Sequence, residues 1–261
     1  MATITSRIET YLKACRALGS LNLPGCPFIP KSLMRHPITN RKAYNEFILW
    51  MTRFGLNDVQ RVWDVGANHG DFSRAASALF PQAHCLMFEP YPKLHDRLTE
   101  LCASDPERFQ LDTSGVGAKA GKMELHVDPA NDTRGSLAGF SESYRKNHAQ
   151  AISSTTHTCD VKTLDDLMTD HAVEALDLLK IDVEGFEAEV LQGGQEALRR
   201  TTALVLEVSL LRQEEGADHH LPKILKTLDG HGFSIVELEP SIFDKENTAR
   251  PVEYNLLALR H

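Results

Sequence analysis

The chain has 261 residues, of which 42% are hydrophobic and 25% charged, and a formal net charge of −8. This length can bury a sizeable core, and the composition is that of a soluble globular protein. The 28 lysines and arginines form no long basic run. Because nucleic-acid binding relies on a cationic surface that neutralises phosphates, we expect no nucleic-acid partner.

The cysteines are an odd number, widely spaced and without a C-x-x-C pair: Cys15, Cys26, Cys85, Cys102 and Cys159. This pattern argues against a disulfide framework or a structural zinc site, so we expect free thiols in a reducing cytoplasm. No apolar run approaches the roughly 20 residues needed to cross a bilayer. Glu9 and Lys13 interrupt the apolar N-terminus, so a signal peptide is not predicted either.

Two segments with helical spacing, 1–18 and 41–54, flank a proline-rich connector and predict an N-terminal helical extension over residues 1–58. Residues 59–261 form the predicted main domain, in which strands and helices alternate. We expect strands at 61–65, 83–88, 108–112, 176–181, 204–208, 233–238 and 254–259, and helices at 71–79, 91–103, 164–168, 185–199 and 218–229. Two extra strands are expected near 123–127 and 158–161, and the polar region 128–155 is interpreted as a substrate-facing loop. The alternation predicts an α/β fold with a mostly parallel sheet covered on both faces.

One stretch, Val62-Trp63-Asp64-Val65-Gly66-Ala67-Asn68-His69-Gly70-Asp71-Phe72, has the pattern of a strand, a tight turn and a helix. Such an arrangement binds nucleotide-like ligands at the carboxyl end of a sheet strand. Gly66 and Gly70 allow positive φ angles and a close approach of the backbone to a ligand. The next apolar run ends in Glu89, where a carboxylate can accept both hydroxyls of a ribose.

The turn lacks the dinucleotide fingerprint, because Asn68 and Asp71 stand where that motif needs glycine. A pyrophosphate at the helix N-terminus would meet the carboxylate of Asp71. S-Adenosylmethionine contains adenosine without phosphate, and Asp64 could hold the ammonium of its amino-acid end. Asp71 could also act as a simple helix N-cap, but that role does not explain Asp64 and Glu89. The stretch therefore predicts a methyl-donor site.

A second motif, Leu178-Leu179-Lys180-Ile181-Asp182-Val183-Glu184-Gly185-Phe186-Glu187, follows a buried strand with two carboxylates. Asp182 and Glu184 should reach the same sheet edge as the first motif. Turn and cap chemistry could account for both residues, whereas two carboxylates converging at a strand end favour a functional site. Glu187 and Glu189 lie early in the next helix, where they favour its dipole and have a structural role.

Taken together, the motifs resemble the FkbM-type S-adenosylmethionine-dependent methyltransferases. The resemblance spans about residues 60–210 and leaves residues 1–58 outside. It rests on the two motifs, the strand-end Glu89, and the flanking segments Val161–Asp166, Leu191–Gly194 and Leu204–Val208.

The resemblance implies a class I methyltransferase fold, which is a Rossmann-like, doubly wound, seven-stranded sheet. Its last strand, here Tyr254–Leu259, would run antiparallel. S-Adenosyl-L-methionine would be the methyl donor. Carried onto matching positions, the resemblance assigns the methionine end of the donor to Asp64, Gly66, Asn68 and Gly70, the ribose to Glu89, and the neighbourhood of the transferred methyl to Asp182. Ala67, Phe72, Ser114 and Ser136 complete the predicted cofactor site.

The resemblance also implies O-methylation of a hydroxyl on a sugar, glycan or polyketide-like small molecule. Because an alcohol is a poor nucleophile at neutral pH, a base should lie within hydrogen-bond reach of it. Asp182 and Glu184 are the predicted catalytic residues. Either could act as base, orient the hydroxyl, or hold a divalent cation that acidifies it, although no resident metal is predicted. His148, His157 and Glu207 are further candidates for the base.

Two alternatives remain open. The same scaffold could methylate nitrogen or carbon, or it could bind the donor without catalysis and serve as a partner protein.

Overall fold

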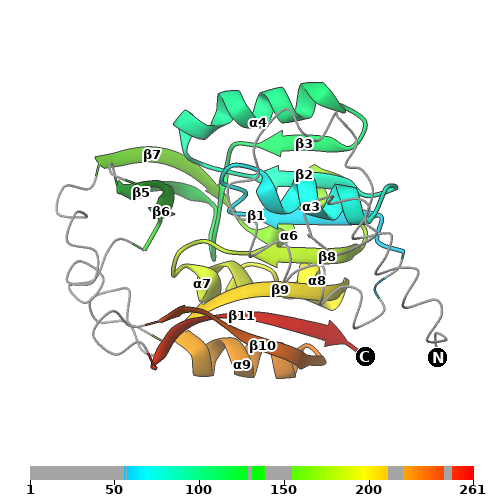
Figure 1. The fold of residues 1–261 in the computed structure, drawn as a ribbon, viewed down its shortest axis with the longest axis vertical. Helices are drawn as coiled ribbons and strands as arrows, with labels where there is room; N and C mark the ends of the chain where they lie inside the picture. Colours follow the sequence, from blue (N-terminus) through cyan, green and yellow to red (C-terminus); the bar gives the residue numbers. More distant parts are fainter. Residues whose placement is uncertain (1–55, 57, 129–130, 139–154, 211–219, 244–248) are drawn as a thin grey trace, which may run out of the picture.

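The structure is a computed structural model that describes residues 56, 58–128, 131–138, 155–210, 220–243 and 249–261 (Figure 1). Nearly all of the predicted N-terminal extension, most of the loop at 128–155, and His148, Cys15 and Cys26 lie outside these residues. Within them, Cys85, Cys102 and Cys159 are free thiols, as predicted. None of the helices in these ranges is long and apolar enough to cross a membrane.

In the described part of the chain, the main sheet has seven strands in the order β10-β11-β9-β8-β1-β2-β3 (Figure 1). Neighbours from β9 to β3 pair in parallel, whereas β11 is antiparallel to both β9 and β10. The predicted seven-stranded, mostly parallel sheet with an antiparallel last strand is therefore confirmed. The bounds are β1 (Arg61–Val65), β2 (His84–Phe88), β3 (Phe109–Asp112), β8 (Leu176–Ile181), β9 (Thr201–Ser209), β10 (Phe233–Phe243) and β11 (Pro251–Arg260).

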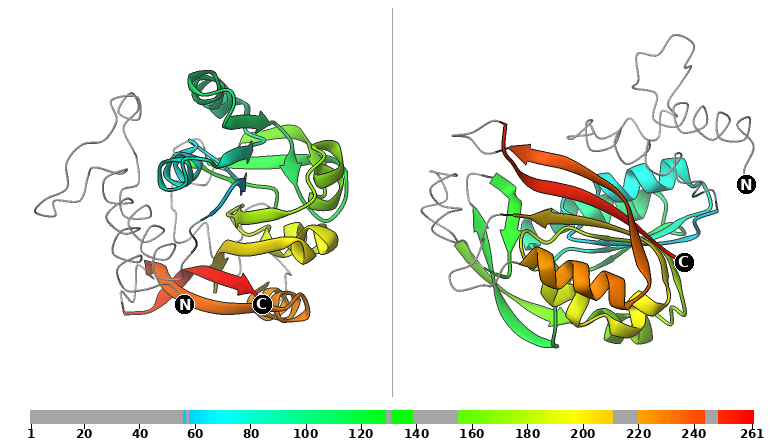
Figure 2. Two further views of the ribbon diagram at one scale, coloured as in Figure 1. Left: turned by 90° about the vertical axis from the view of Figure 1, so that its right-hand side faces the viewer. Right: turned by 90° about the horizontal axis from the view of Figure 1, so that it is seen from below.

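Helices cover both faces of this sheet (Figure 2). Successive side chains of a strand point to opposite faces. Val62 therefore packs in one core with Ala76 of the first helix, whereas Trp63 packs in the other core with Leu167. One face carries α3 (Asp71–Leu79) and α4 (Pro92–Ser104); the other carries α6 (Leu164–Asp170), α7 (Glu187–Gln192), α8 (Gln195–Arg199) and α9 (His220–Gly230). The doubly wound arrangement is confirmed.

The single helix predicted over 185–199 is wrong, because the structure has two helices, α7 and α8. They are separated by Gly193 and Gly194, where the chain passes too close to its neighbours for any side chain. A Cβ on Gly193 would lie 2.1 Å from the carbonyl oxygen of Gly117, and one on Gly194 would lie 2.6 Å from Cδ1 of Leu164. Tertiary packing therefore sets the end of α7.

A second sheet of four strands, in the order β4-β7-β5-β6, is inserted between β3 and α6. Its strands are β4 (Gly115–Val116), β5 (Gly121–Asp128), β6 (Asn131–Ser136) and β7 (Thr155–Lys162). The predicted extra strands are β5 and β7. The loop prediction is wrong for residues 131–136, which form β6. The sequence Asn-Asp-Thr-Arg-Gly-Ser has no apolar alternation, and its strand conformation comes from antiparallel pairing with β5.

Candidate active site

The turn after β1 is fixed by backbone contacts to two neighbouring strands. The N–H groups of Gly66 and Ala67 both donate to the carbonyl oxygen of Phe88 at 3.0 Å. Gly66 has φ +76°, and a Cβ there would lie 1.9 Å from the carbonyl oxygen of Asp182. Glycine is therefore required both by conformation and by the approach of the two motifs.

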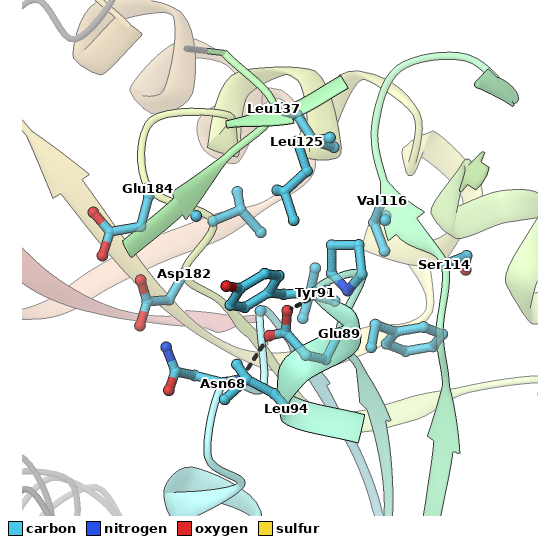
Figure 3. A pocket seen from close by; sticks show the side chains of 17 residues that line it. Asn68, Glu89, Tyr91, Leu94, Ser114, Val116, Leu125, Leu137, Asp182 and Glu184 are labelled. Carbon is cyan, nitrogen blue, oxygen red and sulfur yellow. Dashed lines mark hydrogen bonds between the residues drawn. The ribbon is translucent and has the colours of Figure 1, made fainter. Parts of the chain in front are cut away.

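This turn borders a pocket of about 640 Å³, part of it open to solvent (Figure 3). The pocket lies where β1, β2 and β8 end, and the inserted sheet supplies one wall. Its polar lining is Gly66, Asn68, Glu89, Ser114, Asp182 and Glu184, and its apolar lining includes Tyr91, Leu94, Val116, Leu125 and Leu137. Five of the ten residues predicted to bind the cofactor thus line one pocket, together with both predicted catalytic residues.

Glu89 is buried but borders the pocket. Its Oε2 accepts the backbone N–H of Asn68 at 2.8 Å, and its Oε1 accepts that of Tyr91 at 2.9 Å (Figure 3). Burial raises the pKa of Glu89 to about 7, although these two hydrogen bonds oppose the rise. Each carboxylate oxygen has two lone pairs, so Glu89 retains the capacity to accept ligand hydroxyls.

Asp64 lies behind the turn and is not among the residues that line the pocket. It is completely buried, its Oδ2 accepts the hydroxyl of Ser73 at 2.7 Å, and its Oδ1 lies 3.2 Å from Nζ of Lys180. The carboxylate already has a cationic partner in Lys180. The donor contact assigned to Asp64 stays a prediction, and the geometry favours a supporting role.

The remaining predicted cofactor residues, Ala67, Gly70, Phe72 and Ser136, also lie outside the pocket lining. Ser136 is buried, and its hydroxyl oxygen accepts the backbone N–H of Ala138 at 3.1 Å. Its neighbours Gly135 and Leu137 do line the pocket. Contact of these residues with a donor stays a prediction.

Ser114 contacts the pocket and is held from behind by the end of β3. Its hydroxyl and its backbone N–H both donate to Oδ1 of Asp112, at 2.6 and 2.8 Å. The pKa of Asp112 is lowered by these hydrogen bonds and by His171 and Lys162, which outweigh its partial burial. Ser114 is therefore a lining residue whose side chain is fixed to the end of β3.

The second motif ends β8 and turns sharply into α7. Glu184 has φ +54°, a conformation that an L side chain rarely adopts, and Gly185 has φ +97°. Glu187 braces this turn, because its Oε1 accepts the N–H groups of Val183 and Gly185 at 3.2 and 3.0 Å. Burial raises the pKa of Glu187 to about 7. Glu187 therefore has a structural role, as predicted, and it acts by accepting hydrogen bonds from the backbone of this turn.

Three carboxylates converge beside this turn. Asp182, Glu184 and Glu207 offer oxygens that lie within 4.8 Å of one another. Burial and the neighbouring carboxylates raise the pKa of Glu207 well above its ordinary value. Such a group has the oxygen ligands that Mg²⁺ and Ca²⁺ prefer, so it could hold a divalent cation, or share protons without one.

Two residues without a role in the sequence analysis belong to this region. Tyr91 lines the pocket, and its ring lies 5.2 Å from that of His157, a predicted base candidate on β7. The sequence feature that could have indicated Tyr91 is its position two residues after Glu89, just beyond the end of β2. Lys180 lies behind the pocket. The sequence feature that could have indicated it is a charged residue inside an otherwise apolar, buried strand.

A family model described as "Methyltransferase FkbM domain" matches residues 64–235. The chain belongs to the FkbM methyltransferase family. The resemblance seen in the sequence is thereby confirmed, and with it the class of domain, an S-adenosylmethionine-dependent methyltransferase.

Three relatives are similar to this chain over more than half of its length. The 2-O-methyltransferase NoeI of Sinorhizobium fredii is 29% identical over 162 residues, which cover 59% of this chain and 65% of NoeI. The hexuronic acid methyltransferase AglP of Haloferax volcanii is 29% identical over 56% of this chain and 55% of its own. The 31-O-demethyl-FK506 methyltransferase FkbM of Streptomyces tacrolimicus is 27% identical over 70% of this chain and 75% of its own. The chain thus spans less than two thirds of the length of NoeI and of AglP.

Proposed function

We propose that this protein is an S-adenosylmethionine-dependent O-methyltransferase that acts on a hydroxyl of a sugar, glycan or polyketide-like small molecule. The observation that carries the proposal is the placement of Glu89 and Asp182 around one pocket, at the ends of β2 and β8 (Figure 3). Two of the three relatives are named for transfer to oxygen, and AglP is named for a hexuronic acid. Those names support an oxygen acceptor on a glycan or small molecule.

The residues of the pocket fit the donor. Gly66 and Asn68 present a turn without bulky side chains, and Glu89 presents a carboxylate to ribose hydroxyls. Apolar side chains such as Leu94 and Val116 suit an adenine ring. A lining with three carboxylates suits a ligand with an ammonium and no phosphate. When bound, S-adenosylmethionine supplies a methyl carbon that its sulfonium makes electrophilic.

Asp182 and Glu184 carry the chemistry in this proposal. A carboxylate at either position would accept the proton of the acceptor hydroxyl, which typically contributes about 10²–10⁴-fold to the rate. The strand end before Asp182 would fix this carboxylate, and through it the acceptor hydroxyl, in line with the methyl group and sulfur of the donor. Alignment of two reactants can contribute about 7–11 kcal/mol.

The proposal is tested with the full chain, donor labelled in its methyl group, and matched acceptors that carry a hydroxyl, an amine or an activated carbon. Label in a hydroxylated sugar or macrolide, with the methyl located on oxygen by mass spectrometry, is the expected result. Label on nitrogen or carbon would favour the alternative acceptor. Calorimetric donor binding without transfer to any acceptor would favour a donor-binding partner protein and overturn the proposed enzyme.

A further inference from the structure

The ammonium of Lys180 is buried directly behind the pocket and contacts three groups at once. Nζ donates to the carbonyl oxygen of Gly66 at 2.6 Å, and it lies 3.2 Å from Oδ1 of Asp64 and 3.4 Å from Oδ2 of Asp182. Only 9% of the Lys180 side chain is exposed, against 39% for Asp182. The cation is therefore held inside the protein, while two of its partners, Gly66 and Asp182, line the pocket.

The register of the sheet puts these groups together. Asp64 on β1 and Lys180 on β8 are paired residues of neighbouring parallel strands, so their side chains lie side by side on one face. The backbone N–H of Asp182 donates to the carbonyl oxygen of Val65 at 3.1 Å. Lys180 thus lies where the turn of the first motif meets the strand end of the second.

A buried ammonium is costly unless it is fully compensated, and for stability alone an apolar pair often serves as well. Here the carboxylates of Asp182 and Asp64 raise the pKa of Lys180 despite its burial, so the side chain stays charged. Asp64 alone would neutralise it. The additional contacts, to Gly66 and Asp182, are the ones that reach the pocket lining.

We propose that Lys180 is a positioning residue that fixes the carboxylate of Asp182 relative to the Gly66 turn, and so sets the geometry between donor and base. The inference rests on the proposed function, because it gives Asp182 a part in methyl transfer. Lys180 itself contacts neither donor nor acceptor. The competing interpretation is that Lys180 serves only as the counter-ion of Asp64.

A double-mutant cycle tests the coupling, with kcat measured at saturating donor and acceptor for wild type, Lys180→Met, Asp182→Asn and the double variant. We expect Lys180→Met to lower kcat at least tenfold with donor Kd changed less than about fivefold. The double variant should be within about twofold of Asp182→Asn, because no carboxylate remains to be positioned. Multiplicative losses in kcat would overturn the inference. Lys122→Met is the matched control, since Lys122 pairs with Asp160 on the exposed surface, and it should behave as wild type.

Lys180→Met leaves Asp64 buried beside an uncharged side chain and could fail to fold, so a second variant removes both charges. Lys180→Met combined with Asp64→Asn should melt cooperatively, bind donor, and keep the low kcat of Lys180→Met. Recovery of wild-type kcat in this variant would show that Lys180 only neutralises Asp64, and would overturn the inference. A wild-type chain that transfers no methyl would count against the proposed function and the inference together. Active wild type with multiplicative losses would count against the inference alone.

Discussion

The carboxylate of Glu89 accepts the backbone N–H of Asn68 at 2.8 Å. This contact joins the turn after β1 to the end of β2, two elements that the sequence separates by a complete helix. Because Asn68 has φ +51°, the hydrogen bond also holds the turn in a conformation that few residues other than glycine and asparagine adopt. Glu89 therefore shapes the pocket as well as lining it.

Replacement of Glu89 should weaken the donor complex. Glu89→Ala removes the predicted acceptor of the ribose hydroxyls, and a hydrogen bond to a charged group is worth about 1.5–3 kcal/mol. We expect a rise in donor Kd of about 10–150-fold by isothermal titration calorimetry. Glu124→Ala, on the exposed side of β5, is the control and should leave Kd unchanged. Equal affinity in the Glu89 variant would remove the ribose assignment.

Donor affinity should depend on pH through Glu89. Its pKa in the free protein is raised to about 7 by burial, and the ionised form is the one that accepts two hydroxyls. Affinity should therefore be constant well above pH 7 and fall as the pH drops below it, with protons released on binding near neutrality. Calorimetry in buffers of different ionisation enthalpy measures that release. Glu89→Gln should lose it; an unchanged proton release in this variant would assign the dependence to another group.

Asp182→Asn should separate catalysis from binding. The variant keeps the shape of the side chain and removes the charge, so turnover should fall about 10²-fold or more, with donor affinity within a few-fold of wild type. Single-turnover rates and calorimetry measure the two effects. Loss of donor binding with normal turnover at saturation would instead make Asp182 a cofactor ligand. Activity abolished by a chelator and restored by Mg²⁺ would make the group with Glu184 and Glu207 a metal site.

Truncation after Arg250 should abolish folding. This change removes all of β11, which lies between β9 and β10 and contains the completely buried Leu256, Leu257 and Ala258. Without it, β10 has no partner strand and the core beneath it is exposed, so insoluble protein is expected. Deletion of the exposed His261 alone is the control. A soluble truncation with a cooperative melting transition would contradict the interior position of β11.

The sequence predicted correctly those elements that are marked by a local pattern or by a continuous run of buried residues. β1, α3 and β8 have the predicted bounds, because continuous apolar runs and a glycine-bounded turn mark them. Asp182 and Glu89 were placed at one sheet edge by the rule that parallel strands end together. The partner of Asp64 was not predictable in this way, since Lys180 lies on a strand more than a hundred residues further along the chain.

The remaining errors share one cause, which is that tertiary contacts decided the outcome. Gly193 and Gly194 break the predicted helix because Gly117 and Leu164 occupy the space for their side chains. β6 is a strand because β5 pairs with it, although its composition is that of a turn. Neither neighbour can be identified from a window of sequence around the residue concerned.

Because of the inserted sheet, the walls of the pocket come from two different segments of the chain. Leu125 and Leu137 come from strands encoded between β3 and α6, whereas Gly66, Glu89 and Asp182 come from the ends of the main sheet. Because they come from separate segments of the chain, the two walls can be changed independently of each other. Exchange of this insertion for that of another family member should therefore alter one wall of the pocket and leave Gly66, Glu89 and Asp182 in place.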